Sequence, residues 1–149
     1  MSQTNELEIM ERIALDLERV EESLASSFNT GVEDFNALIR PLSAAGGKRL
    51  RAQLCLLIAN AGTSIERQRV KIAEAVEMLH LATLIHDDVL DQAEIRRGED
   101  TIHMHKGNKV AILSGDYLFA KAFKIVSEMT NMKYLQVFSH IITCLVEGE

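Results

Sequence analysis

Apolar residues recur along most of the chain at steps of three and four, which is the spacing of one face of an α-helix. The clearest run covers about residues 4–27, where glutamates and arginines fill the opposite face and the apolar positions are Leu7, Met10, Ile13, Leu17, Val20 and Leu24. No segment alternates apolar and polar residues in the manner of a β-strand. The pattern therefore predicts an all-α fold.

Turn residues divide the rest of the pattern into five further predicted helices. Their spans are 32–39 (ending before Pro41), 48–61, 65–91, 109–127 and 132–146. Gly62 is expected to end the third helix of the chain, Thr63 and Glu66 have capping-box spacing for the fourth, and Asn108 should cap the fifth. Residues 43–47 are small and predict a flexible connection.

The fourth predicted helix should be buried, because residues 76–90 carry apolar side chains on several of its faces. Without a partner surface, an apolar helix such as 69–91 would expose a large apolar patch. His103 and His105 fall in the loop after this helix, where solvation is the simpler expectation. No repeat or linker divides the chain, so residues 1–149 should form one domain.

Composition and charge narrow the possible functions. The net charge of -6 disfavours nucleic-acid binding, which needs a basic surface. The N-terminus is polar and acidic, unlike a secretory signal, and no run reaches the ~18 apolar residues of a membrane span, so a cytoplasmic protein is expected. Cys55 and Cys144 lie in apolar runs without metal-site spacing, so both should be small buried thiols.

Three carboxylates lie near the end of the fourth predicted helix, namely Asp87, Asp88 and Asp91. Asp87 and Asp91 are four residues apart and share one helix face, where like charges repel. The C-terminal end of a helix is also unfavourable for anions, so a cation should compensate them. Oxygen ligands of this kind suit Mg²⁺ better than zinc. A solvated acidic helix end is the plainer alternative.

Basic residues flank this acidic cluster on both sides in the sequence. Lys48 and Arg51 follow two glycines at a helix start and are three residues apart, so both can reach one anion. Arg96 and Arg97 follow the aspartates, and paired guanidiniums bind diphosphate well. An exposed basic turn and simple charge balance remain the alternatives. His80 lies two turns before Asp87 on the same face, although a lone histidine there is more often a core residue.

Four strings give the chain a specific resemblance to the trans-isoprenyl diphosphate synthases, of the long-chain bacterial type. They are Gly-Gly-Lys48-Arg-Leu-Arg51, His80-Leu-Ala-Thr-Leu-Ile-His-Asp87-Asp-Val-Leu-Asp91, Arg96-Arg97-Gly98 and Ser114-Gly-Asp116-Tyr-Leu-Phe119. The resemblance implies an isoprenoid-synthase-type antiparallel helical bundle. It also implies a Mg²⁺-dependent reaction that joins isopentenyl diphosphate to an allylic prenyl diphosphate, and a homodimer or heterodimer.

The resemblance also implies residue roles. Asp87, Asp88 and Asp91 match the motif that binds Mg²⁺ and the allylic diphosphate, and Arg96 matches an arginine on that diphosphate. The residues that match the isopentenyl diphosphate site are Lys48, Arg51, His80 and Arg97. A bulky residue shortly before the first aspartate shortens the product in this family. Ala82 and Thr83 stand there in this chain, which implies a long product.

The chain departs from the family in length. Family members are about twice as long and carry a second aspartate-rich motif, which has no counterpart among these 149 residues. We therefore expect the N-terminal half of the bundle and an incomplete active site. Two alternatives are a non-catalytic short subunit of a two-component synthase and a terpene cyclase relative. The aspartate motif argues against the first, while Lys48 and Arg51 argue against the second.

Overall fold

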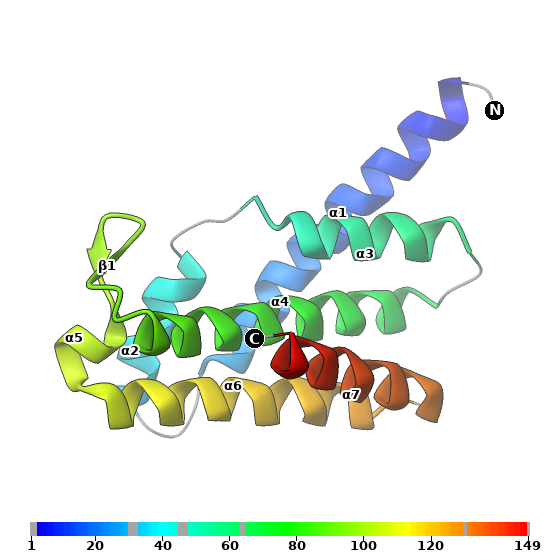
Figure 1. The fold of residues 1–149 in the computed structure, drawn as a ribbon. Helices are drawn as coiled ribbons and strands as arrows, with labels where there is room; N and C mark the ends of the chain where they lie inside the picture. The colour runs from blue at the N-terminus through cyan, green and yellow to red at the C-terminus, as the bar shows by residue number, and fades with distance from the viewer. Residues whose placement is uncertain (1–2, 30–32, 45–47, 63–64, 130, 149) are drawn as a thin grey trace.

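The chain folds into helices joined mainly by short turns, as the periodicity predicts (Figure 1). A computed structural model describes residues 3–29, 33–44, 48–62, 65–129 and 131–148. Within these ranges the elements are α1 (Gln3–Ser27), α2 (Glu33–Ala44), α3 (Leu50–Asn60), α4 (Glu66–Leu90), β1 (Ile95–Arg96), β2 (Glu99–Asp100), α5 (Ile102–Lys106), α6 (Asn108–Ser127) and α7 (Met132–Glu147). The all-α prediction is confirmed, apart from the short hairpin.

Helix α4 forms the centre of the packing. It lies between α3 and α6, antiparallel to both, and also packs against α1 (Figure 1). Ala75 and Ala82 are fully buried in α4, and their small side chains allow close approach of neighbouring helices. Met78 of α4 and Leu118 of α6 are also fully buried, and each such side chain contributes about 1.5–3 kcal/mol to folding. The prediction that α4 is buried on several faces is confirmed.

The interface between α1 and α4 also contains buried charge. Asp16 of α1 is fully buried, and its Oδ2 lies 2.6 Å from Nε of Arg69 on α4. Glu74 of α4 is fully buried as well, and its carboxylate accepts hydrogen bonds of 2.7 Å from Ser23 and from Ser27 of α1. Buried carboxylates are tolerated when such partners are present. The polar contacts therefore tie α1 to α4 at fixed points.

The absence of strands was a wrong prediction. β1 and β2 pair antiparallel, with Ile95 opposite Asp100 and Arg96 opposite Glu99. The turn between them is Arg97-Gly98, and both residues have positive φ, 55° and 85°, as a two-residue hairpin turn requires. Strands of two residues are too short to show alternation in a sequence. The loop predicted at residues 96–98 is therefore a tight hairpin.

Several predicted helix ends differ from the structure. Helix α2 runs through Pro41 to Ala44, because a proline removes a single backbone donor and a helix can continue past it. His103 and His105 lie in the short helix α5, and not in a loop. Ala61 is the C-cap of α3, and Gly107 precedes α6, where Asn108 is the first helical residue. The Thr63 cap and the connection 45–47 lie outside the described residues.

The two thiols have different environments. Cys55 is half-buried, and burial raises its pKa to about 11, so it stays protonated at neutral pH. Cys144 is exposed on α7, so the prediction of a buried thiol is wrong at this position.

Exposed apolar side chains gather on the outer helices. Helices α1, α3 and α6 supply the partner surface that the apolar helix 69–91 needs, so it exposes little apolar surface itself. The exposed large apolar residues of α3 and α7 are Leu50, Leu54, Leu57, Ile58, Met132, Val137, Ile141, Leu145 and Val146. None of the described helices is both long enough and apolar enough to cross a lipid bilayer.

Candidate functional site

The acidic cluster lies where α4 ends. Asp87 and Asp88 belong to the last turn of α4, and Asp91 is its C-cap. Asp88 is buried, Asp87 is half-buried and Asp91 is exposed. The last carbonyl groups of a helix carry partial negative charge, so these carboxylates lie in an unfavourable field. A cation at this end would relieve both sources of repulsion.

Arg96 supplies a cation to one of the three carboxylates. Its Nε donates to Oδ1 of Asp88 at 2.6 Å, across the turn from β1 to the end of α4. The side chains of Asp87 and Asp91 make no hydrogen bond or ion pair with any residue that the structure describes. The structure therefore divides the predicted metal ligands into a protein-paired carboxylate and two available ones.

The available donors fit a hard cation. Asp87 and Asp91 offer oxygen atoms on one face of the helix end, which suits Mg²⁺. Among the described residues, no group of three or more His, Cys, Asp or Glu side chains is placed to hold a metal ion. Two carboxylates suffice for Mg²⁺ when water and substrate phosphates complete its coordination. The residues fit a metal shared with a phosphorylated ligand, and not a closed protein cage.

The hairpin after α4 is fastened to the helix end. The amide of Ala93 donates to the carbonyl of Asp88 at 2.9 Å, and Oγ1 of Thr101 donates to the carbonyl of Ala93 at 2.8 Å. Thr101 is only 4% exposed, so these bonds are shielded from water. Together with the left-handed residue Gln92 (φ 53°), they return the chain across the end of α4. This is how Arg96 reaches Asp88.

The cations predicted to hold a diphosphate come close to His80. Burial lowers the pKa of His80, and the positive charges of Arg51, Arg97 and Arg96 lower it further, whereas Glu77 opposes them. The three arginines thus act on the ring through their positive charge. Arg51 comes from the first turn of α3, while the other two arginines come from the hairpin. The structure thus brings together predicted site residues from three separate segments.

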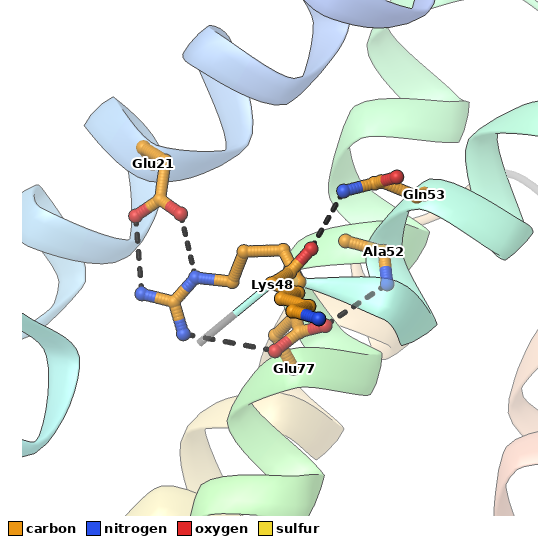
Figure 2. A network of polar contacts seen from close by, with 6 residues as sticks. Glu21, Lys48, Ala52, Gln53 and Glu77 are labelled. Carbon is orange, nitrogen blue, oxygen red and sulfur yellow. Dashed lines mark hydrogen bonds and ion pairs between the residues drawn. The ribbon is translucent and has the colours of Figure 1, made fainter. Parts of the chain in front are cut away.

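Lys48 lies just before α3, and its side chain is exposed. Its carbonyl accepts a hydrogen bond of 2.6 Å from Nε2 of Gln53, which fixes the backbone of this turn (Figure 2). The glycines 46 and 47 that precede it lie outside the described residues. Lys48 is therefore placed at the entrance of α3, next in the chain to Arg49.

Sequence reasoning did not single out Arg49, in this turn, or Glu77 of α4, which contacts it. Nε and Nη2 of Arg49 donate to the carboxylate of Glu21 on α1, at 2.5 and 3.1 Å. Glu77 of α4 lies on the other side, with Oε2 at 3.7 Å from Nη1 of Arg49 and Oε1 accepting from the amide of Ala52 at 2.9 Å (Figure 2). The sequence offered one weak sign of Glu77, namely that an acidic residue stands one turn before His80 in an otherwise apolar helix.

A cavity of about 390 Å³ lies on a neighbouring face of α4. Its floor is apolar, and Asp88, Arg96 and Arg97 lie at its polar side; the apolar residues include Leu38, Leu81, Leu84 and Ile85. Lys48, Arg51, His80, Asp87 and Asp91 do not line it. The cavity therefore borders the hairpin side of the site, and not the face that carries His80 and Asp87.

The two predicted chain-length residues do not line this cavity either. Ala82 is fully buried, and Oγ1 of Thr83 donates to the carbonyl of His80 at 2.8 Å. Any side chain larger than alanine at position 82 would have to displace its neighbours.

His86 joins α4 to α6, one residue before Asp87. Its Nε2 lies 3.1 Å from the carbonyl oxygen of Ile112 and 3.4 Å from Oδ1 of Asp116, and its ring stacks on Phe119. A Cβ at Gly115 would lie 2.2 Å from Nε2 of His86. The glycine of the Ser114-Gly-Asp116 string is thus the position that admits the His86 ring.

Comparisons with known proteins agree with this picture. The family described as Polyprenyl synthetase matches residues 32–149. The chain is 34% identical over 141 residues to octaprenyl diphosphate synthase of Escherichia coli (strain K12), covering 95% of this chain and 44% of that protein. It is 33% identical over 147 residues to solanesyl diphosphate synthase 1, chloroplastic, of Arabidopsis thaliana, covering 95% and 36%. The chain thus spans less than half the length of these relatives.

Solved structures share the fold. A polyprenyl synthase from Caulobacter crescentus CB15, complexed with calcium and isoprenyl diphosphate, has a TM-score of 0.86 at 36% identity, over 93% of this chain and 43% of that one. Heptaprenyl diphosphate synthase from Staphylococcus aureus has a TM-score of 0.84 at 28% identity, over 91% and 43%. These matches confirm the predicted isoprenoid-synthase-type bundle, of which the chain corresponds to a part. The motifs, the fold and the match of the family over residues 32–149 agree. The chain therefore belongs to the polyprenyl synthetase family.

Proposed function

We propose that the chain acts in trans-prenyl transfer, in which isopentenyl diphosphate is added to an allylic prenyl diphosphate to give a long-chain all-trans polyprenyl diphosphate. The observation that carries the proposal is the end of α4, where Arg96 pairs with Asp88 at 2.6 Å and the side chains of Asp87 and Asp91 have no partner among the described residues. A carboxylate pair for Mg²⁺ and guanidiniums for phosphate match the needs of two diphosphate substrates.

The reaction breaks the allylic C–O bond and releases diphosphate. The electrons of the isopentenyl double bond form the new C–C bond, and a proton is then lost from the isopentenyl unit. The products are a chain longer by one isoprene unit, diphosphate and a proton. Bound Mg²⁺ supplies Lewis-acid stabilisation of the leaving diphosphate. Asp87 and Asp91 would hold the metal in this proposal.

The cations of the chain bind and orient the two diphosphates. Lys48, Arg51 and Arg97 hold isopentenyl diphosphate, and His80 joins them as a neutral ring that donates one hydrogen bond. Arg96 faces the allylic diphosphate while it remains paired with Asp88. Asp88 then contributes to the metal end of the site by holding Arg96.

The length of the product belongs to the same proposal. Ala82 places only a methyl group before the aspartates, and the hydroxyl of the small Thr83 is bonded to the carbonyl of His80. Ala82→Phe should give shorter products, because the ring blocks the growing chain and also overpacks a fully buried position. Products would be separated by chain length on reversed-phase plates. An unchanged product distribution would contradict this role of residue 82.

The proposed activity is tested by a prenyl-transfer assay. The 149-residue chain receives Mg²⁺, isopentenyl diphosphate and farnesyl diphosphate, and the same residues are assayed when joined to the C-terminal part of the S. aureus heptaprenyl diphosphate synthase. We expect product from the joined protein, and loss of about 10²-fold or more in an Asp87→Ala version. The Asp87→Ala protein should keep its helical circular dichroism.

The outcomes separate the candidate functions. Product from the chain alone would mean that one aspartate motif suffices or that a dimer completes the site. Product from the joined protein alone supports a site that needs further residues. No product from either, in folded proteins, would overturn the proposal in favour of a non-catalytic partner subunit. A homodimer or heterodimer in the cytoplasm is proposed with the function, and native mass measurement tests the dimer.

A further inference from the structure

Arg49 holds an unusual backbone conformation at the start of α3. It is the N-cap of that helix and has φ 46° and ψ 38°, in the left-handed region that favours glycine. A non-glycine residue keeps such a conformation only when its surroundings fix it. Since Arg49 stands between Lys48 and Leu50-Arg51, whatever fixes it also fixes the two cations on either side.

Two carboxylates fix the side chain of Arg49. The guanidinium is only 7% exposed and lies between α1 and α4, where Glu21 accepts two of its N–H groups and Glu77 lies opposite (Figure 2). The hydrogen bond to Glu21 raises the pKa of Arg49, against the effect of burial. The arginine therefore stays charged in the interior, where a charge requires close partners.

Glu77 makes a second contact that Glu21 does not make. Its Oε1 accepts from the amide of Ala52, the third residue of α3, while its Oε2 faces Arg49. The first amides of a helix have no partner within the helix, so a carboxylate there stabilises the helix start. Glu77 is 3% exposed, which shields both contacts from water. One side chain of α4 thus holds the first turn of α3.

Glu77 is also close to the site. It precedes His80 by three residues on α4, so both side chains lie on one face of that helix. Burial and the charge of Arg51 lower the pKa of His80, and the charge of Glu77 raises it. Glu77 is therefore a buried helical neighbour of His80 that also contacts the start of α3.

We infer that Glu77 is a positioning residue, which acts through Arg49 and the first turn of α3 to hold Lys48 and Arg51 in place for diphosphate binding. The inference rests on the proposed function for the identity of the diphosphate as isopentenyl diphosphate. Glu77 touches no substrate in this role. Its loss would leave a buried arginine with one carboxylate fewer and would release the turn that carries both cations.

Glu77→Gln tests this role, with Glu74→Gln as its matched control. Glu74 is another buried glutamate of the same helix, but it contacts Ser23, Ser27 and Lys71, away from α3. The affinity of the purified chain for inorganic diphosphate is measured by titration calorimetry without metal. We expect binding to weaken about 10-fold in Glu77→Gln and less than about 2-fold in Glu74→Gln. Urea midpoints establish that both variants are folded.

A double-mutant cycle tests the route through Arg49. If both residues act in one network, Glu77→Gln combined with Arg49→Gln should bind diphosphate no more weakly than the weaker single variant. Purely additive losses would overturn the route. Simple destabilisation would not produce such coupling in a binding constant.

The outcomes distinguish this inference from the proposed function. Equal diphosphate affinity in Glu77→Gln and the wild type overturns the inference, as does a wild-type chain that does not bind diphosphate. A selective loss in Glu77→Gln supports it, even where the prenyl-transfer assay yields no product. In that case the proposed reaction fails and the positioning role stands.

Discussion

At the scale of single residues, the site depends on how one ring is surrounded. His80 is half-buried among arginines, so its pKa lies below 6.5 in the folded chain and the ring is neutral at pH 7. A neutral imidazole retains one donor and one acceptor nitrogen. This state suits a hydrogen bond to a phosphate oxygen in a pocket that already contains several positive charges.

The pKa of His80 predicts a dependence of stability on pH. The folded chain binds fewer protons here than the unfolded chain, so this contribution to the free energy of unfolding is present above pH 6.5 and is lost as the pH falls towards the folded pKa. The substitution His80→Gln removes this pH-dependent contribution, because glutamine does not titrate. We expect the wild type to lose more stability than His80→Gln between pH 7.5 and pH 5.5, measured by urea unfolding. Equal losses would contradict the assigned environment.

The sequence could indicate some of these residues and not others. Lys48, Arg51, His80 and Asp87 belong to strings whose order and spacing are specific. Glu77 carried no such signal, because its partner amide is 25 residues away, in another helix. A contact of that kind is created by packing, and the sequence shows neither the packing nor the left-handed backbone of Arg49.

At the scale of helices and strands, periodicity was sufficient for the long elements. α1, α4, α6 and α7 lie within a few residues of their predicted spans, because apolar spacing persists over many turns. Short elements and ends were less predictable. The hairpin at Ile95–Asp100 depends on two left-handed residues and on bonds to the end of α4, and α2 continues through Pro41.

The close contact between α4 and α6 predicts that one added methyl group at position 115 lowers the stability of the fold. Gly115→Ala would place a Cβ 2.2 Å from Nε2 of His86, so the two helices or the ring must shift. We expect a loss of about 1–3 kcal/mol in the free energy of unfolding. Gly62→Ala, whose Cβ would meet only a carbonyl oxygen at 3.8 Å, is the control and should be close to neutral. Chemical unfolding monitored by circular dichroism measures both.

A second substitution makes this prediction specific. If the clash with the ring is the cause, the penalty of Gly115→Ala should shrink in a His86→Ala background, where the ring is absent. The same penalty in both backgrounds would assign the effect to another contact. The result also bears on the site, since His86 is next to Asp87 and fixes that turn of α4 against α6.

At the scale of the whole molecule, the site is an assembly of three segments. The start of α3 carries Lys48 and Arg51, α4 carries His80 and the aspartates, and the hairpin carries Arg96 and Arg97. The resemblance predicted which residues belong together. It could not show that Asp88 is already paired with Arg96, or that the cavity beside it lies on another face from His80.

The buried charges between α1 and α4 have a consequence for how the bundle assembles. Two amphipathic helices can slide past each other by one turn and still cover apolar surface, so apolar contacts alone define their alignment weakly. In this chain a slip of one turn would separate Asp16 from Arg69 and Glu74 from its two serines at the same time. Each buried carboxylate would then lose its partners on the other helix and keep only a contact within its own, Asp16 with Arg19 and Glu74 with Lys71, which is unfavourable. These pairs therefore favour one alignment of α1 on α4 over the others. Because Glu21 lies on α1 too, the same alignment brings its carboxylate to Arg49.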